Sequence, residues 1–76
     1  MKAVTVAIVY DASTNTYGAT SDELPDIVAI SEDRDDVLRR FVGAAHAHLE
    51  FLRETGEPLP IGFASDAEFV AVPLEV

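Results

Sequence analysis

Residues 17–30 constrain the fold of this chain more than any other segment does. The segment begins with the composition of a short strand, continues through an acidic turn at Asp22–Asp26, and becomes apolar again at Ile27–Ile30. Within the turn, Pro25 lacks an N–H donor and restrains Leu24 to extended backbone. This order predicts two strands joined by a tight corner, with an acidic helix start directly after the second strand.

The rest of the chain alternates strand and turn patterns around one helical segment. Apolar side chains recur with a period of two at Val4, Val6, Ile8 and Tyr10, which is typical of a strand. The expected strands are Lys2–Tyr10, Thr16–Ser21, Ile27–Ile30 and Glu68–Val76, the expected turns are Asp11–Asn15 and Asp22–Asp26, and the expected long connection is Glu57–Ala67. Pro73 predicts that the last strand lies at an edge of the sheet.

A helix is predicted from about residue 34 to about residue 54. The side-chain oxygen of Asp33 suits the position before the first turn, and Gly56 suits the position after the last turn. Apolar residues recur at spacings of three and four, which predicts one buried stripe. The residues of this stripe are Val37, Leu38, Phe41, Val42, Ala45, Leu49 and Leu52. We expect Phe41 to lie in the core.

Together these elements predict an α+β fold in a single domain, residues 1–76, with the order β-β-β-α-β. Two hairpin connections make the first three strands antiparallel, and a helical crossover returns the chain parallel to the first strand. The expected sheet is four-stranded and mixed, with the strand order 3-2-1-4 and the helix packed on one face.

The net charge of −9 limits the classes of partner. Phosphates demand Lys and Arg, so we expect no direct binding to nucleic acid and none to an anionic membrane. An acidic surface favours solubility or an electropositive protein partner. No apolar run approaches the ~20 residues of a membrane span, and the first residues do not resemble a signal peptide. We therefore expect a cytoplasmic protein.

We expect no catalytic centre, no cofactor and no metal site. The chain has no cysteine, and its two histidines, His46 and His48, would point to nearly opposite sides of a helix. Asp11, Glu50 and Glu68 could be imagined as the remnant of a metal-dependent nuclease, but we interpret them as solvated charges. A nuclease stays a third hypothesis, after the two that follow.

The order of these motifs resembles the HicB antitoxin superfamily, including its short members. The matching pieces are Tyr17-Gly18-Ala19, Asp22-Glu23-Leu24-Pro25, Glu32-Asp33-Arg34-Asp35-Asp36 with Leu38, Gly56-Glu57-Pro58-Leu59-Pro60, and Leu74-Glu75-Val76. The resemblance covers nearly the whole chain, residues 4–76. It implies a HicB-like fold, which is similar in topology to part of ribonuclease H.

The chain departs from the pattern of that family in one residue and in its length. The family usually has Gly after Leu-Pro, where this chain has Asp26, a residue type that tolerates left-handed backbone angles better than most. Full HicB antitoxins often carry a DNA-binding segment after this fold, and nothing follows Val76 here. The resemblance thus implies a HicB-like domain without a DNA-binding module. Such a domain would bind a small basic HicA-type toxin that cleaves messenger RNA and would block it by occlusion.

Two surfaces are candidates for contacts with partners. The acidic corner consists of Asp22, Glu23 and Asp26, and the strand face consists of Ala3, Thr5, Ala7 and Val9. The corner would face a basic toxin, because opposite charge speeds association and sets specificity. The strand face is small and uncharged, which predicts a homodimer that covers it. The alternative to the antitoxin hypothesis is a standalone structural or regulatory homodimer with no toxin partner.

Overall fold

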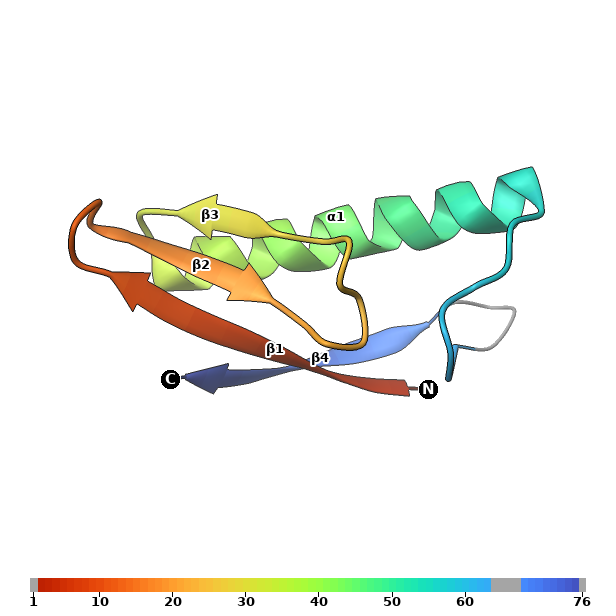
Figure 1. Ribbon diagram of the computed structural model, residues 1–76, viewed down its shortest axis with the longest axis horizontal. Coiled ribbons are helices and arrows are strands. Elements are labelled where there is room, and N and C mark those ends of the chain that lie inside the picture. Colours follow the sequence, from red (N-terminus) through yellow and green to blue (C-terminus); the bar gives the residue numbers. More distant parts are fainter. Residues whose placement is uncertain (1, 64–67, 76) are drawn as a thin grey trace.

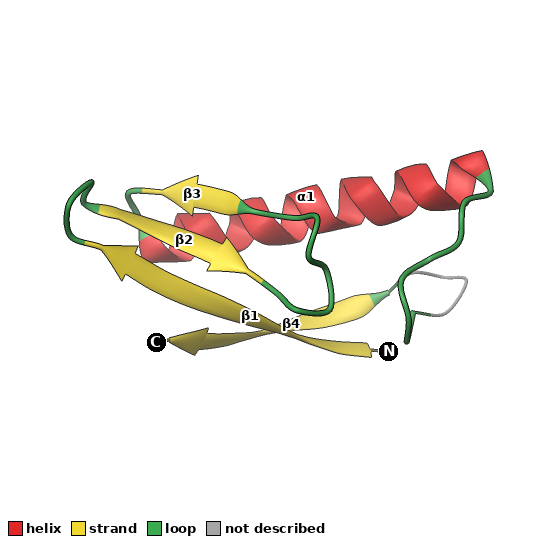
Figure 2. Cartoon of the chain, viewed as in Figure 1, coloured by secondary structure: helices red, strands yellow, loops and turns green. Residues whose placement is uncertain are grey.

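The computed structural model describes residues 2–63 and 68–75 (Figure 1) and has the predicted α+β architecture. Its elements are β1 (Lys2–Asp11), β2 (Thr16–Thr20), β3 (Ala29–Ser31), α1 (Arg34–Thr55) and β4 (Phe69–Glu75). The four strands form one sheet in the order β3-β2-β1-β4, and α1 lies along one face of it (Figure 2). The predicted strand order is confirmed.

The bounds of the elements differ from the expected ones by one or two residues. β3 begins at Ala29 and not at Ile27, because the Ile27 N–H donates to the Leu24 carbonyl at 3.1 Å and keeps this part of the chain in a turn. Part of the expected connection Glu57–Ala67 and the last residue of the expected strand Glu68–Val76 lie outside the described residues.

β1 is the central strand, and its two neighbours cover different parts of it. β2 pairs with the second half of β1, from Ala7 opposite Thr20 onward, in antiparallel register. β4 pairs in parallel register along most of β1, with Lys2 opposite Phe69 at the start. The first half of β1 therefore has a strand partner on one side only, and the corner after β2 lies against its other side.

Local signals at both ends of α1 explain its length. The Asp33 carboxylate accepts a hydrogen bond from the Asp36 N–H at 2.9 Å, so it caps the first turn. At the other end Gly56 has a φ of 75°, in the left-handed region, and its N–H reaches the Arg53 carbonyl. Both predicted caps are confirmed.

The core lies between α1 and the sheet. The predicted helix stripe supplies Val37, Phe41, Ala45 and Leu49, and the strands and corner supply Val4, Val6, Ile8, Ala19, Leu24, Ile27, Ala29 and Phe69. Phe41 is fully buried, as expected. Tyr10 extends the Val4 to Ile8 pattern but is half exposed, with its ring 5.1 Å from that of Tyr17.

Candidate functional site

The acidic corner joins β2 to β3 and is held against the core. Leu24 is only 2% exposed, and its N–H donates to the Ser21 carbonyl at 3.3 Å. Asp22 and Asp26 on either side of it are exposed. The buried Leu24 thus fixes the backbone from which these two carboxylates project.

Glu23 has a different role from its two acidic neighbours. Its side chain is half-buried, and one carboxylate oxygen accepts the Thr5 backbone N–H at 3.0 Å. Thr5 lies in the part of β1 that β2 does not reach, so its N–H has no strand partner on that side. Glu23 therefore supplies the hydrogen bond that a longer β2 would have made, and the outward charge of the corner rests on Asp22 and Asp26.

The two histidines contact different elements. His48 Nε2 lies 4.0 Å from a carboxylate oxygen of Asp26, so the helix sits beside the acidic corner. The His46 ring stacks on the Phe69 ring of β4, with centroids 4.6 Å apart. Neither contact was predicted, because both depend on how the helix lies across the sheet.

The face of the sheet that points away from α1 is apolar and open to solvent. We call it the open face, and it comprises Ala3, Thr5, Ala7 and Val9 of β1, Gly18 and Thr20 of β2, Ile30 of β3, and Val70, Val72 and Leu74 of β4. None of these residues is charged, but the same side of β1 ends at the exposed Asp11, which pairs with Thr16 of β2. The structure brings together all four residues of the predicted dimer face.

Sequence reasoning missed the larger side chains of the open face. Val70, Val72 and Leu74 lie opposite Ala3, Thr5 and Ala7 in the parallel register, and 45–54% of each is exposed. Their period-two pattern was visible in the sequence. Both faces of β4 are largely apolar, however, so the pattern alone could not tell which face was covered.

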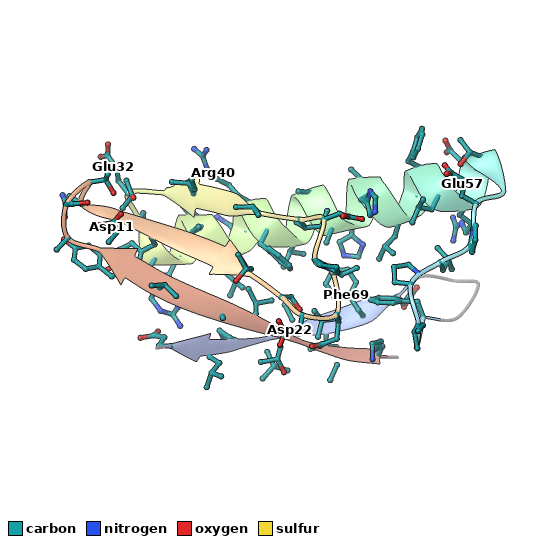
Figure 3. All side chains as sticks on the ribbon, viewed as in Figure 1. Asp11, Asp22, Glu32, Arg40, Glu57 and Phe69 are labelled. Atoms are coloured by element: carbon teal, nitrogen blue, oxygen red, sulfur yellow. The ribbon has the colours of Figure 1, made fainter. Side chains whose placement is uncertain are left out.

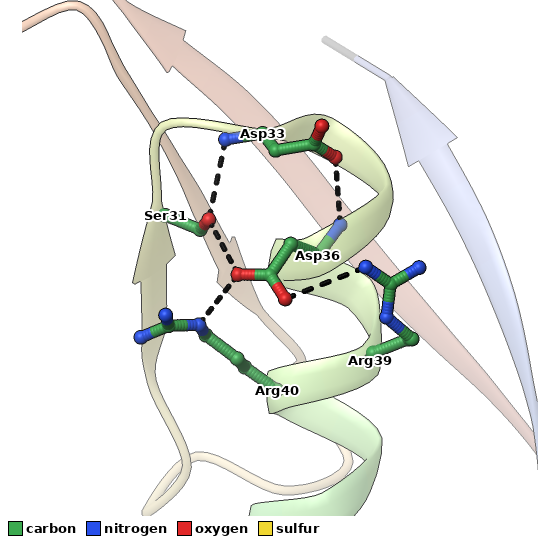
Figure 4. A network of polar contacts seen from close by, with 5 residues as sticks. All are labelled: Ser31, Asp33, Asp36, Arg39 and Arg40. Carbon is green, nitrogen blue, oxygen red and sulfur yellow. Dashed lines mark hydrogen bonds and ion pairs between the residues drawn. The ribbon is translucent and has the colours of Figure 1, made fainter.

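The start of α1 holds a network of polar side chains (Figure 4). Asp36 accepts hydrogen bonds from the Ser31 hydroxyl at 2.7 Å and from Arg40 Nε at 2.6 Å, and Arg39 lies 3.5 Å away. The Ser31 hydroxyl, followed by the Arg40 guanidinium, holds the pKa of Asp36 below its ordinary value of 3.8. This network joins β3 to the first turns of the helix.

An open hollow lies beside this network. Its lining residues are Thr16, Ile30, Ser31, Glu32 and Arg40. Among the described residues that line it, Arg40 is the only cation, and it is already paired with Asp36. Glu32 would repel an anion and the Arg40 guanidinium is already engaged, so the lining does not favour a small anion.

Two of the three carboxylates of the hypothetical nuclease remnant, Asp11 and Glu50, are engaged in local contacts, and Glu68 lies exposed directly before β4. Asp11 accepts hydrogen bonds from the Ser13 N–H at 2.9 Å and hydroxyl at 2.6 Å, which lowers the pKa of Asp11. Glu50 lies 3.7 Å from Arg53 along the helix. Within residues 2–63 and 68–75, no three His, Cys, Asp or Glu side chains lie close enough to hold a metal ion. Figure 3 shows Asp11, Asp22 and Glu57 spread along the molecule.

No protein-family model, no curated protein and no solved structure matches the chain. Among the described residues, no helix has both the length and the apolar character needed to cross a membrane.

Proposed function

We propose that this chain is a non-catalytic interaction domain of the antitoxin type. It binds a small basic toxin of the HicA type, which cleaves messenger RNA, and it blocks that toxin by covering its active surface. Because messenger RNA is cleaved in the cytoplasm, the proposal places the chain there. The proposed partner rests on the resemblance to the HicB superfamily, and the proposed mode of binding rests on charge.

The acidic corner is the observation that carries this proposal. Asp22 and Asp26 are exposed on a backbone that the buried Leu24 anchors, and Glu23 ties the same corner to β1. A rigid pair of carboxylates on a chain of net charge −9 attracts a basic partner from a distance and sets its orientation on contact. Such a surface changes the rate and specificity of association more than the final affinity.

A second candidate function is a standalone structural or regulatory homodimer with no toxin partner. The open face favours it, because a contiguous apolar surface on a small protein marks an interaction site. The two candidates use different surfaces, so one chain could serve both.

The test is affinity capture from cells that encode the chain, with identification by mass spectrometry and assay of the captured protein on RNA. We expect to capture a small basic protein. Assayed without the chain, this protein should cleave RNA, and it should lose that activity when the chain is added. The double variant Asp22→Asn/Asp26→Asn should slow its association at least tenfold. The matched control Glu32→Gln/Glu54→Gln removes the same charge from exposed sites outside the corner.

Salt provides a second readout of the same proposal. Opposite charges attract less strongly as ionic strength rises, so association should slow between ~50 and ~500 mM NaCl. A captured set without a basic RNA-cleaving protein would contradict the proposal. Equal effects of the corner variant and its control would instead remove the corner from the binding site.

A further inference from the structure

We propose that His48 makes the acidic corner sensitive to pH: when its ring binds a proton, the positive charge beside Asp26 weakens the attraction of the corner for a basic partner. This regulation rests on the proposed function, because it acts on the surface assigned there to that partner. Its first step, a change of the electric field at the corner, is a property of the free chain and can be measured without a partner.

The helix holds His48 beside the corner. His48 Nε2 lies 4.0 Å from a carboxylate oxygen of Asp26, and the His48 side chain is 29% exposed, whereas that of Asp26 is 81% exposed. His48 directly precedes the buried Leu49 of α1, and Asp26 follows the buried Leu24 of the corner by two residues. Both side chains therefore project from backbone that packing in the core holds in place.

Asp26 is the charged group that faces His48. In the corner, Glu23 turns instead to the Thr5 N–H, and on α1 Glu50 lies 3.7 Å from Arg53. The strands beneath the helix carry no charge in β2 or β3, and β1 and β4 carry theirs at the ends, in Lys2, Asp11 and Glu75. The helix positions one turn before and after His48 are uncharged: Ala44, Ala45, Phe51 and Leu52.

The chemistry of histidine sets the pH range of this regulation. Histidine is the side chain whose charge ordinarily changes between about pH 5 and 8, where exposed carboxylates in general stay charged. A neutral ring leaves the corner with the two outward charges of Asp22 and Asp26, whereas a protonated ring offsets one of them. Because ion pairs at an exposed site are weak, the attraction of the corner changes gradually with pH and is not switched off.

A small cationic nitroxide measures the field at the corner of the free chain. The probe relaxes nearby backbone amide protons in NMR spectra, and a neutral nitroxide of the same size gives the reference. From about pH 7.5 to about pH 5.5, the cationic-to-neutral relaxation ratio at the amides around Asp26 should fall about 1.5-fold. This is the change in local concentration that one unit charge causes at ~8 Å in water at physiological salt.

Two matched variants assign that change to one histidine. His48→Gln removes the ring beside Asp26 and should abolish most of the fall, whereas His46→Gln removes a ring that stacks on Phe69 and should leave the fall in place. The parent adds a readout that needs no variant: the carboxyl-carbon NMR signal of Asp26 should shift over the same pH range as the ring protons of His48. An equal fall in both variants, or an Asp26 signal that does not follow His48, overturns the proposal.

Association with the captured basic protein separates this proposal from the proposed function. Loss of both corner charges should slow association at least tenfold, so association should slow about threefold more in the parent than in His48→Gln between the same two pH values. If Asp22→Asn/Asp26→Asn does not slow association, the proposed function fails, and the nitroxide ratio alone decides the role of His48. If that variant does slow association and His48→Gln keeps the pH dependence of the parent, the proposed function stands and the role of His48 is overturned.

Discussion

The Glu23 carboxylate accepts the Thr5 backbone N–H at 3.0 Å, eighteen residues away along the chain. β2 stops at Thr20, opposite Ala7, so the first half of β1 would otherwise leave its N–H groups on that side to water. The Glu23 carboxylate thus accepts the hydrogen bond that a backbone carbonyl of a longer β2 would have accepted. The same contact fixes the acidic corner to the central strand of the sheet and thereby positions Asp22 and Asp26.

This contact predicts a stability difference within the acidic corner. Glu23→Ala should lower the free energy of unfolding by about 0.5–1.5 kcal/mol, the usual net contribution of one hydrogen bond. In a domain of this size, 1 kcal/mol shifts the melting temperature by ~4–8 °C. Glu23→Gln keeps an acceptor oxygen and should cost less. Asp22→Ala, at an exposed neighbour, should leave the thermal midpoint nearly unchanged, and an equal loss in both Ala variants would refute the assigned role.

Two phenylalanines on one helix should differ strongly in their effect on stability. Phe41 is fully buried beneath the sheet, whereas Phe51 is 55% exposed. Phe41→Ala should cost ~3–5 kcal/mol, which in a domain this small is enough to prevent folding. Phe51→Ala should leave a cooperative transition close to that of the parent. Urea denaturation followed by circular dichroism would compare them, and a folded Phe41 variant of near-parental stability would place that residue outside the core.

Substituting alanine for Gly43 and for Gly56 should change the stability of the protein in opposite directions. Gly43 lies inside α1 with nothing within 4 Å of an added Cβ, so Gly43→Ala should stabilise the protein by about 0.8–1.0 kcal/mol. Gly56 has a φ of 75° after the last turn, so Gly56→Ala should destabilise it by about 1–2 kcal/mol. Thermal melts of the two single variants would show whether each substitution raises or lowers the melting temperature. A stabilising Gly56→Ala change would mean that the helix does not end in a left-handed residue.

The lowered pKa of Asp36 predicts a loss of stability in acid. The Ser31 hydroxyl and Arg40 favour the charged carboxylate in the folded chain, so its pKa there lies below the ordinary 3.8. Stability from this group is therefore fully present above about pH 5, and it is lost as the pH falls through the folded value. Asp36→Asn should be less stable than the parent at pH 7, and the difference in their free energies of unfolding should disappear near about pH 2. Glu32→Gln, outside the network, serves as the control, and a gap that stays constant with pH would contradict the mechanism.

The sequence alone was enough to predict the strand order, the helix and its two caps. These features depend on local chemistry: a carboxylate at Asp33, a glycine at position 56, and apolar spacing that puts Val37, Phe41 and Leu49 on one side. The crossover connection then left few topologies to choose from. Local signals of this kind do not depend on the rest of the chain, so they can be read without it.

Only the tertiary structure decided which side chains of β4 join the open face and what each acidic residue does. Both faces of β4 are largely apolar, and its register with β1 is what sends Val70, Val72 and Leu74 to solvent beside Ala3 and Ala7. Glu23 looks like its neighbours in sequence, yet its contact with Thr5 exists only because β2 ends early. Both results come from contacts between residues far apart in the chain, which no local pattern specifies. The physical reason is that pairing register and strand length are set by the whole sheet at once.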